Sequence, residues 1–247
     1  MIQFLKRRLQ KFDPLIFSHF KNHLRMIEIN YNIFKNRHFI PDPRNQVFIE
    51  TSGVCNLLCK ICGYQKKRIA KVIMPMDLFQ NIVNQAVKMG FSRFGLTPLS
   101  GEPFVDNGFW GKLNFLDNHP QVEGYYFFSN FIVPDTDKIS RLFTLQKLNT
   151  VHISLYGHDP ESFSKITQRP KKLYSKLVEN LNTLYQLYSS NQPFNIGLSW
   201  RTVPSFSENQ SPNSDVQEIV AKFKMKHNIK ARNLQHYNNW GGSGYKQ

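Results

Sequence analysis

The sequence predicts an α/β protein, a partial (β/α)6 TIM-like barrel with an N-terminal helical extension. Short apolar runs alternate with segments whose apolar residues recur at helical spacing, and the alternation repeats six times between residues 46 and 235. Strands that alternate with helices in this way form βαβ units and a parallel sheet. Six units are too few to close a barrel of eight strands, so we expect the sheet to stay open.

Composition and charge narrow the class of protein. The chain has 247 residues, of which 40% are hydrophobic and 20% charged, so it can build a core and wholesale disorder is excluded. No apolar run approaches the roughly 18 residues that span a bilayer. The N-terminus lacks the continuous apolar stretch of a secretion signal, so we expect a cytoplasmic protein. The net charge of +15 favours anionic partners, although it is also compatible with general solvation.

Residues 1–45 form the predicted extension. They hold nine Lys or Arg residues against three acidic ones, and apolar residues recur at helical spacing over 4–12 and again over 17–34. Pro41 and Pro43 mark its end. The extension is expected to pack on the main domain, and the alternative is a basic amphipathic helix that binds a surface. We assign the core to residues 46–235 and a C-terminal tail, possibly a truncated linker, to 236–247.

The first half of the core is expected to begin with a strand over 47–49. A long loop over 51–75 follows, and then a helix over 77–89 that stops at Gly90. Four residues form the expected buried face of this helix: Leu78, Ile82, Val83 and Ala86. A second strand is expected over 94–99.

The second half continues the alternation. Strands are expected over 125–129, 151–155, 196–200 and 229–234, and helices over 135–143, 174–188 and 214–223. Asp159 is expected to cap a further helix whose first residue is Pro160. Four residues form the expected buried stripe of the helix over 174–188: Leu177, Leu181, Leu184 and Tyr188.

Polar and unusual residues follow the expected strands, where parallel α/β folds carry their chemistry. After the loop at 51–75, this edge collects Gly101–Glu102–Pro103, Ser129–Asn130, Tyr156–Gly157 and Arg201. His152 lies inside a strand instead, and we expect it to be a packed core residue.

The three cysteines of the chain are Cys55, Cys59 and Cys62. An odd, clustered set is not a disulfide framework and indicates a reduced metal or cluster site. A structural zinc site needs a fourth ligand, and the nearest histidines are the distant His38 and His119. An iron–sulfur cluster held by three thiolates would leave one iron open for another ligand. Zinc and three structural thiols remain the alternatives.

These residues resemble a known family. Cys55-x3-Cys59-x2-Cys62 after a first strand is similar to the signature loop of the radical S-adenosylmethionine (radical SAM) superfamily, and Ser100-Gly101-Glu102-Pro103 resembles its GGEP motif. The resemblance covers residues 46–234. This segment is similar to the core of SPASM or twitch-type enzymes without their C-terminal domain, which binds auxiliary clusters. Two positions depart from the pattern: Ile61 stands where an aromatic residue is usual, a place that Tyr64 could fill, and Ser100 replaces the first glycine.

The resemblance implies a cofactor set and a reaction. Cys55, Cys59 and Cys62 would hold a [4Fe–4S] cluster whose fourth iron is chelated by SAM. Reductive cleavage of SAM would give a 5′-deoxyadenosyl radical that abstracts hydrogen from a substrate. Six further residues are implied to bind SAM: Gly101, Glu102, Pro103, Ser129, Ser154 and Arg169. Gly101 would let the backbone approach the cofactor closely, and Arg201 is a weaker candidate for SAM or substrate.

The substrate and partners remain open at this stage. The resemblance favours a peptide or protein, or an intermediate of surface-glycan metabolism, and it implies a one-electron reductant such as flavodoxin or ferredoxin. Two alternatives from other classes stand beside the enzyme. One is a non-catalytic scaffold of the same fold, and the other is a basic RNA-binding or RNA-modifying protein, which the charge suggests.

Overall fold

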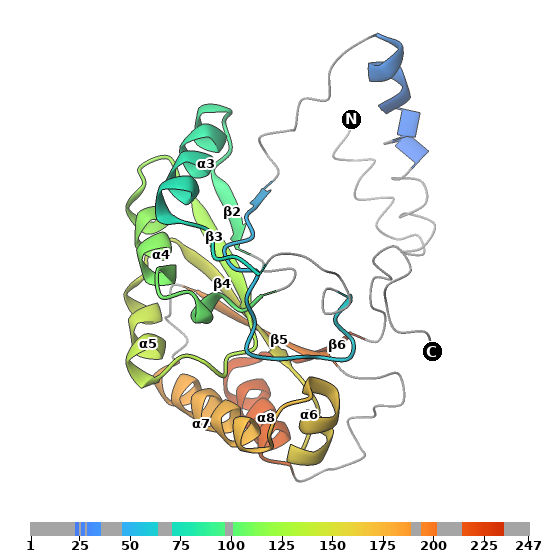
Figure 1. Ribbon diagram of the computed structural model, residues 1–247, viewed down its shortest axis with the longest axis vertical. Coiled ribbons are helices and arrows are strands. Elements are labelled where there is room, and N and C mark those ends of the chain that lie inside the picture. Colours follow the sequence, from blue (N-terminus) through green and yellow to red (C-terminus); the bar gives the residue numbers. More distant parts are fainter. Residues whose placement is uncertain are drawn as a thin grey trace. The chain divides into compact units, whose positions relative to one another are not determined.

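A computed structural model describes residues 23–24, 26–27, 29–35, 46–63, 71–96, 101–188, 194–201 and 214–234 (Figure 1). The chain divides into two compact units, Met1–Asp42 and Pro43–Gln247. In the first unit, residues 29–34 are helical. Among the described residues, no helix is both long and apolar enough to cross a membrane. The expected helical pattern at 4–12, the C-terminal tail at 236–247 and the side chains of His38, Tyr64 and Ser100 lie outside the described residues.

A parallel sheet of six strands forms the centre of the second unit. The strands lie side by side in chain order, and each pairs in parallel with its neighbour. They are β1 (Val47–Phe48), β2 (Arg93–Leu96), β3 (Gly124–Ser129), β4 (Leu148–Leu155), β5 (Asn195–Arg201) and β6 (Arg232–Leu234). The sheet is open, with β1 and β6 at its two edges. The predicted fold class, an α/β partial barrel, is therefore confirmed.

Helices connect the strands and cover the sheet. They are α3 (Met76–Lys88), α4 (Phe109–Asn118), α5 (Thr136–Arg141), α6 (Pro160–Thr167), α7 (Lys172–Leu187) and α8 (Asp215–His227), with short 3-10 turns η2 (Pro103–Val105) and η3 (Leu142–Thr144). In Figure 1, α3, α4 and α5 lie along one side of the sheet. Successive residues of a strand point to opposite faces of the sheet. Every second side chain of the strands therefore faces the side on which these helices lie.

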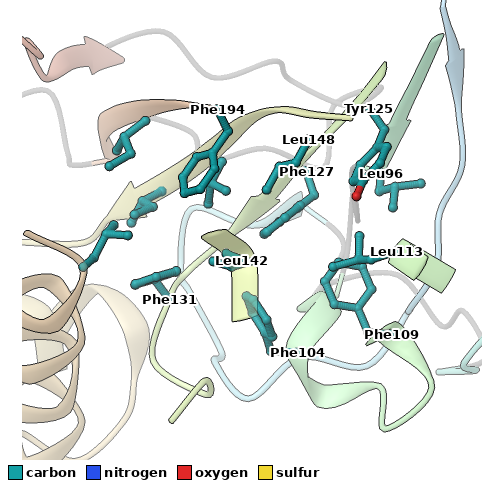
Figure 2. Packing of buried hydrophobic residues seen from close by; sticks show 14 of the residues in the cluster. Leu96, Phe104, Phe109, Leu113, Tyr125, Phe127, Phe131, Leu142, Leu148 and Phe194 are labelled. Atoms are coloured by element: carbon teal, nitrogen blue, oxygen red, sulfur yellow. The ribbon is translucent and has the colours of Figure 1, made fainter. Parts of the chain in front are cut away.

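Aromatic side chains dominate the core under α4. The rings of Phe104, Phe109 and Phe127 meet edge to face, with centroids 5.3 to 5.7 Å apart, and all three are buried. Figure 2 shows them beside Phe131, whose ring centroid lies 6.3 Å from that of Phe104. Burial of each such ring contributes about 1.5–3 kcal/mol. The cluster thus anchors the chain that follows β2 to the strand that carries Ser129.

Three expectations about elements are corrected. Leu78 is 46% exposed, and the buried face of α3 is formed by Phe79, Val83, Ala86 and Val87. Helix α4 was not expected at all. The sixth strand begins at Arg232 rather than at residue 229, because α8 runs on to His227 and ends in a left-handed Asn228. Leu177, Leu181 and Leu184 on α7 are buried as expected, whereas Tyr188 follows the end of the helix and is only half-buried.

Candidate functional site

The cysteine loop, residues 51–63, crosses from β1 toward the end of α6. Its first part pairs with the chain that leads into α3: Gly53 N–H donates to the Val72 carbonyl at 2.7 Å and Met74 N–H to the Thr51 carbonyl at 3.0 Å. Its second part docks on the last turn of α6. There Leu58 N–H donates to the carbonyl of Thr167 and Lys60 N–H to that of Ile166, at 3.0 and 2.9 Å. Terminal carbonyls that a helix cannot satisfy itself thereby hold the loop.

The three cysteines lie close together as free thiols. Cys59 is buried, and Cys55 and Cys62 are half-buried. Burial raises the pKa of the Cys55 thiol to about 11 and raises that of Cys59 further, and repulsion among the three sulfur sites adds to both shifts. Among the described residues, no group of three or more His, Cys, Asp or Glu side chains has the arrangement of a metal site.

The donor set nevertheless fits an iron–sulfur cluster. Thiolates are the ligands that such clusters use, and the three thiols lie within electrostatic range of one another. Their water-poor surroundings disfavour a bare thiolate, which a metal would stabilise. Arg169 and Arg201 lie near enough to lower the pKa values of Cys55 and Cys59 respectively. Glu102 opposes Arg169 at Cys55, so the two arginines offset only part of the negative charge around the thiols.

Gly101 brings the second motif against the cysteine loop. A Cβ atom at this position would lie 1.9 Å from the Ser52 carbonyl oxygen and 2.8 Å from that of Val54. Only glycine permits this approach, because both contacts are with backbone. The next residue reinforces it, since Glu102 N–H donates to the Val54 carbonyl at 2.8 Å. The structure therefore shows a close approach of Gly101 to the cysteine loop, and an approach to a cofactor stays a prediction.

The Glu102 side chain is buried, with 1% of its surface exposed. Its carboxylate accepts hydrogen bonds from the Ser129 hydroxyl at 2.7 Å, from Asn130 N–H at 2.7 Å and from Phe104 N–H at 3.3 Å. Burial raises the pKa of Glu102 to about 7 although the three donors oppose this shift. All three donors are neutral, so the carboxylate sits in a site that a cationic group would complement. Pro103 follows as the first residue of η2.

Asn56 and Arg169 connect the cysteine loop to its surroundings. Asn130 Nδ2 donates to Asn56 Oδ1 at 2.7 Å, and Arg169 Nε donates to the Asn56 carbonyl at 2.7 Å. Arg169 follows α6, so the end of this helix holds the loop through a side chain as well as through its carbonyls. The two terminal guanidinium nitrogens of Arg169 make no hydrogen bond to a described residue.

Ser154 and Arg201 form a second polar group at the ends of β4 and β5. Arg201 Nε donates to Ser154 Oγ at 2.8 Å, and the Tyr156 hydroxyl is also hydrogen bonded to Ser154. The pKa of Tyr156 lies well above its ordinary value, chiefly because of burial, and the charges of Cys59 and Cys55 raise it further. These residues therefore lie within electrostatic range of the thiols.

The structure thus brings the sequence-predicted residues to one edge of the sheet. Glu102 also affects Cys55 electrostatically, which joins the two motifs in space. Asn56 was not identified from the sequence, and Asn130 and Tyr156 were noted only as strand-end residues, because amide and phenol side chains carry no motif of their own. His152 stacks on Phe128 at 4.4 Å and is half-buried. Burial and the charges of Arg232 and Arg201 lower its pKa.

Comparisons with known proteins identify the fold. No family model matches the chain, and no curated protein matches its sequence. Solved structures do match. SuiB of Streptococcus suis bound to its precursor peptide SuiA has a TM-score of 0.58 and 14% identity, over 81% of this chain and 40% of that one. His-tagged anSMEcpe with bound AdoMet has a TM-score of 0.54 and 16% identity, over 78% and 50%.

A third match is HydG, a maturase of the [FeFe]-hydrogenase, with a TM-score of 0.53 and 13% identity over 78% of this chain and 44% of that one. These proteins are radical SAM enzymes, and the chain shares their partial barrel. The chain spans 40 to 50% of the length of SuiB and anSMEcpe in these structures.

Proposed function

We propose that the chain is the core of a radical SAM enzyme. The observation that carries the proposal is the juxtaposition of the buried Glu102 carboxylate with a loop of three thiols, at the carboxyl edge of an open α/β barrel. The shared fold supports it, since anSMEcpe structures with this fold bind AdoMet. The thiols fit the cluster, and the carboxylate fits the amino group of SAM.

Each polar group then has a role in holding the cofactors. Cys55, Cys59 and Cys62 would bind a [4Fe–4S] cluster, which when bound supplies the electron that cleaves SAM to a 5′-deoxyadenosyl radical. Glu102 would accept hydrogen bonds from the SAM amino group. Arg169 would use its terminal nitrogens for the SAM carboxylate, which suits a planar guanidinium.

The two serines have different places in this scheme. Ser129 donates to Glu102 and accepts from Phe131 N–H at 2.8 Å, so both of its hydrogen-bonding roles are used within the protein. It would act on SAM through the carboxylate that it orients. Ser154 lies near the end of β4, where it accepts a hydrogen bond from Arg201. It would face the ribose of SAM, while Arg201 stays a candidate for SAM or substrate. Gly101 and Pro103 would fix the position of Glu102.

A peptide or protein is the favoured substrate. The structures of SuiB and anSMEcpe hold a precursor peptide and the Cp18Cys peptide, respectively, which supports this choice over an intermediate of surface-glycan metabolism. The proposed one-electron reductant is flavodoxin or ferredoxin. The proposed location of the protein is the cytoplasm, because cysteines stay reduced there.

Anaerobic reconstitution tests the proposed function. The protein is loaded with iron and sulfide and incubated with SAM and dithionite, and 5′-deoxyadenosine is measured by chromatography. We expect a [4Fe–4S] cluster with three protein ligands and formation of 5′-deoxyadenosine, both abolished in Cys59→Ala. Zinc at the thiols, or a loaded cluster that never cleaves SAM, would refute the enzyme. The second of these results would favour the non-catalytic scaffold.

The net charge of +15 supports a second candidate, a basic RNA-binding protein. Binding of this kind rests on contacts with phosphates and weakens steeply as salt rises. Titration of labelled RNA at two salt concentrations would distinguish it, because a peptide-modifying enzyme needs no such salt-dependent affinity.

A further inference from the structure

Asn130 stands between the two motifs of the proposed site. Its backbone N–H donates to Glu102 Oε2 at 2.7 Å, while its side-chain Nδ2 donates to Asn56 Oδ1 in the cysteine loop at 2.7 Å. The side-chain oxygen accepts from Ile132 N–H at 3.2 Å. The residue is 5% exposed. One residue therefore contacts the carboxylate, the cysteine loop and its own loop at the same time.

The loop that carries Asn130 is held from the outer layer of helices. Phe131 has a left-handed backbone, with φ of 59°, which is unfavourable for an aromatic residue. Asn180 on α7 is 2% exposed, and its Nδ2 donates to the carbonyls of Phe131, Ile132 and Pro134 at 2.9, 3.2 and 2.8 Å. A buried amide that satisfies three carbonyls of one turn can hold that turn in a strained shape.

We propose that Asn130 and Asn180 are positioning residues that tie the Glu102 segment and the cysteine loop into one unit. Asn180 fixes the turn at 131–134, the turn fixes Asn130, and Asn130 fixes the distance between Glu102 and the loop at Asn56. The relay itself is a property of the protein without cofactors. Its consequence for SAM rests on the proposed function, because SAM would have to reach the carboxylate and the cluster together.

Amide hydrogen exchange of the metal-free protein tests the relay without any cofactor. The probes are Leu58 N–H and Lys60 N–H, whose hydrogen bonds hold the cysteine loop on α6. We expect exchange at these amides to be about tenfold faster in Asn130→Ala, which loses the hydrogen bond to Asn56 as well as the one that Asn130 accepts from Ile132 N–H. Asn56→Leu should have the same effect, because leucine has a similar size but no acceptor, and it replaces a side chain that is only half-buried. Asn56→Asp keeps an acceptor and should retain the wild-type rate.

Two further variants complete the exchange experiment. Asn180→Ala should accelerate exchange at 131–133 and also at Leu58 and Lys60. Asn118→Ala removes an exposed amide that bonds only within α4 and should change neither. Unchanged exchange in the cysteine loop of Asn130→Ala and Asn56→Leu would overturn the relay. Acceleration confined to 131–133 in Asn180→Ala would remove Asn180 from the relay.

Binding of SAM to the reconstituted protein tests the consequence. Calorimetry should give a dissociation constant about tenfold higher for Asn130→Ala than for wild type. The double variant Asn56→Ala/Asn130→Ala should lose less affinity than the sum of the two single variants, since both single changes remove the hydrogen bond between Asn130 and Asn56. Additive losses would overturn the positioning role. Failure of the wild type to bind cluster or SAM would refute the proposed function instead, and the exchange result would still decide the relay.

Discussion

The buried Glu102 carboxyl makes the stability of the ligand-free protein depend on pH. Burial raises its pKa to about 7 from an ordinary 4.5, so the folded chain holds this proton more tightly than the unfolded chain does. The free energy of unfolding should therefore fall as the pH rises through this window, by roughly 3 kcal/mol in all. Denaturant titrations from pH 4.5 to 8 measure the slope.

Glu102→Gln is the control for this pH dependence. It should flatten the slope in the same window, although the amide will lower stability at every pH because one of its N–H groups must face a donor. An identical slope in both proteins would show that other groups cause the pH dependence.

Gly101 and Gly111 form a matched pair of glycines with opposite expected effects. Alanine at Gly101 would place its Cβ 1.9 Å from a backbone oxygen, whereas at Gly111 the nearest atom is the Met76 sulfur at 3.9 Å. Gly101→Ala should destabilise the protein by about 3 kcal/mol or more and lower its iron content. Gly111→Ala, inside α4, should stabilise it by about 0.5–1 kcal/mol. Equal unfolding midpoints would contradict the close approach at Gly101.

At the scale of elements, a buried ion pair joins η2 to α4. Lys112 and Asp106 have side chains that are 1% and 4% exposed and form a salt bridge, and Asp106 also accepts from Gly108 N–H at 2.7 Å. Lys112→Met leaves the Asp106 carboxylate buried without its cation, which should cost about 3–5 kcal/mol. The double variant Asp106→Asn/Lys112→Met should recover most of this loss. Urea unfolding of the three proteins measures both changes, and a single variant as stable as wild type would show that the pair does not hold the turn.

The capping box of α6, the helix on which the cysteine loop docks, should contribute to the stability of the protein. Asp159 accepts from Ser162 N–H at 2.7 Å and begins the helix whose far end holds Leu58 and Lys60. Asp159→Ala should cost about 1 kcal/mol of stability. Thermal unfolding measures this cost. Asp135→Ala is the matched control, because Asp135 caps α5 in the same way but α5 does not hold the cysteine loop.

The elements show how far sequence patterns reach. Alternation of strands and helices predicted the parallel sheet, since the buried face of each element requires apolar residues at regular spacing in the sequence. Helix α4 was missed because Gly111 weakens its helical preference and Gly108, at its N-cap, has no side chain to signal a helix start, although Phe109, Leu113 and Leu116 do recur at helical spacing. On α3, Val83 and Ala86 are buried as predicted, but Phe79 rather than its apolar neighbour Leu78 is buried in the first turn, a choice that tertiary packing makes.

Some residues of the candidate site could be predicted from the sequence and others could not. Thiols, the Gly-Glu-Pro segment and the strand-end polar residues are visible in the sequence, because their chemistry or spacing is unusual. The bond between Asn130 and Asn56 joins residues 74 positions apart, and that between Arg169 and Asn56 spans 113. Such pairings depend on how the strands are laid side by side, and amides are common throughout the chain. They could be identified only in the folded structure.

At the scale of the whole molecule, every strand pairing lies within the unit Pro43–Gln247. A protein that begins at Pro43 should therefore fold and load its cluster as the full chain does, with the same unfolding midpoint within a few degrees. Circular dichroism and iron analysis of the two chains measure this. Loss of the sheet in the shorter protein would show that the basic extension belongs to the fold.

The docking of the cysteine loop on the end of α6 has a consequence for protein synthesis. A ribosome makes Cys55, Cys59 and Cys62 long before it makes Ile166 and Thr167, whose carbonyls hold Leu58 and Lys60. During that interval β1, β2 and β3 can already pair in order, but α6, on which the cysteine loop docks, has not yet been made. Nascent chains therefore expose three reduced sulfurs while translation continues, so the supply of iron and the exclusion of oxygen matter before the chain is released.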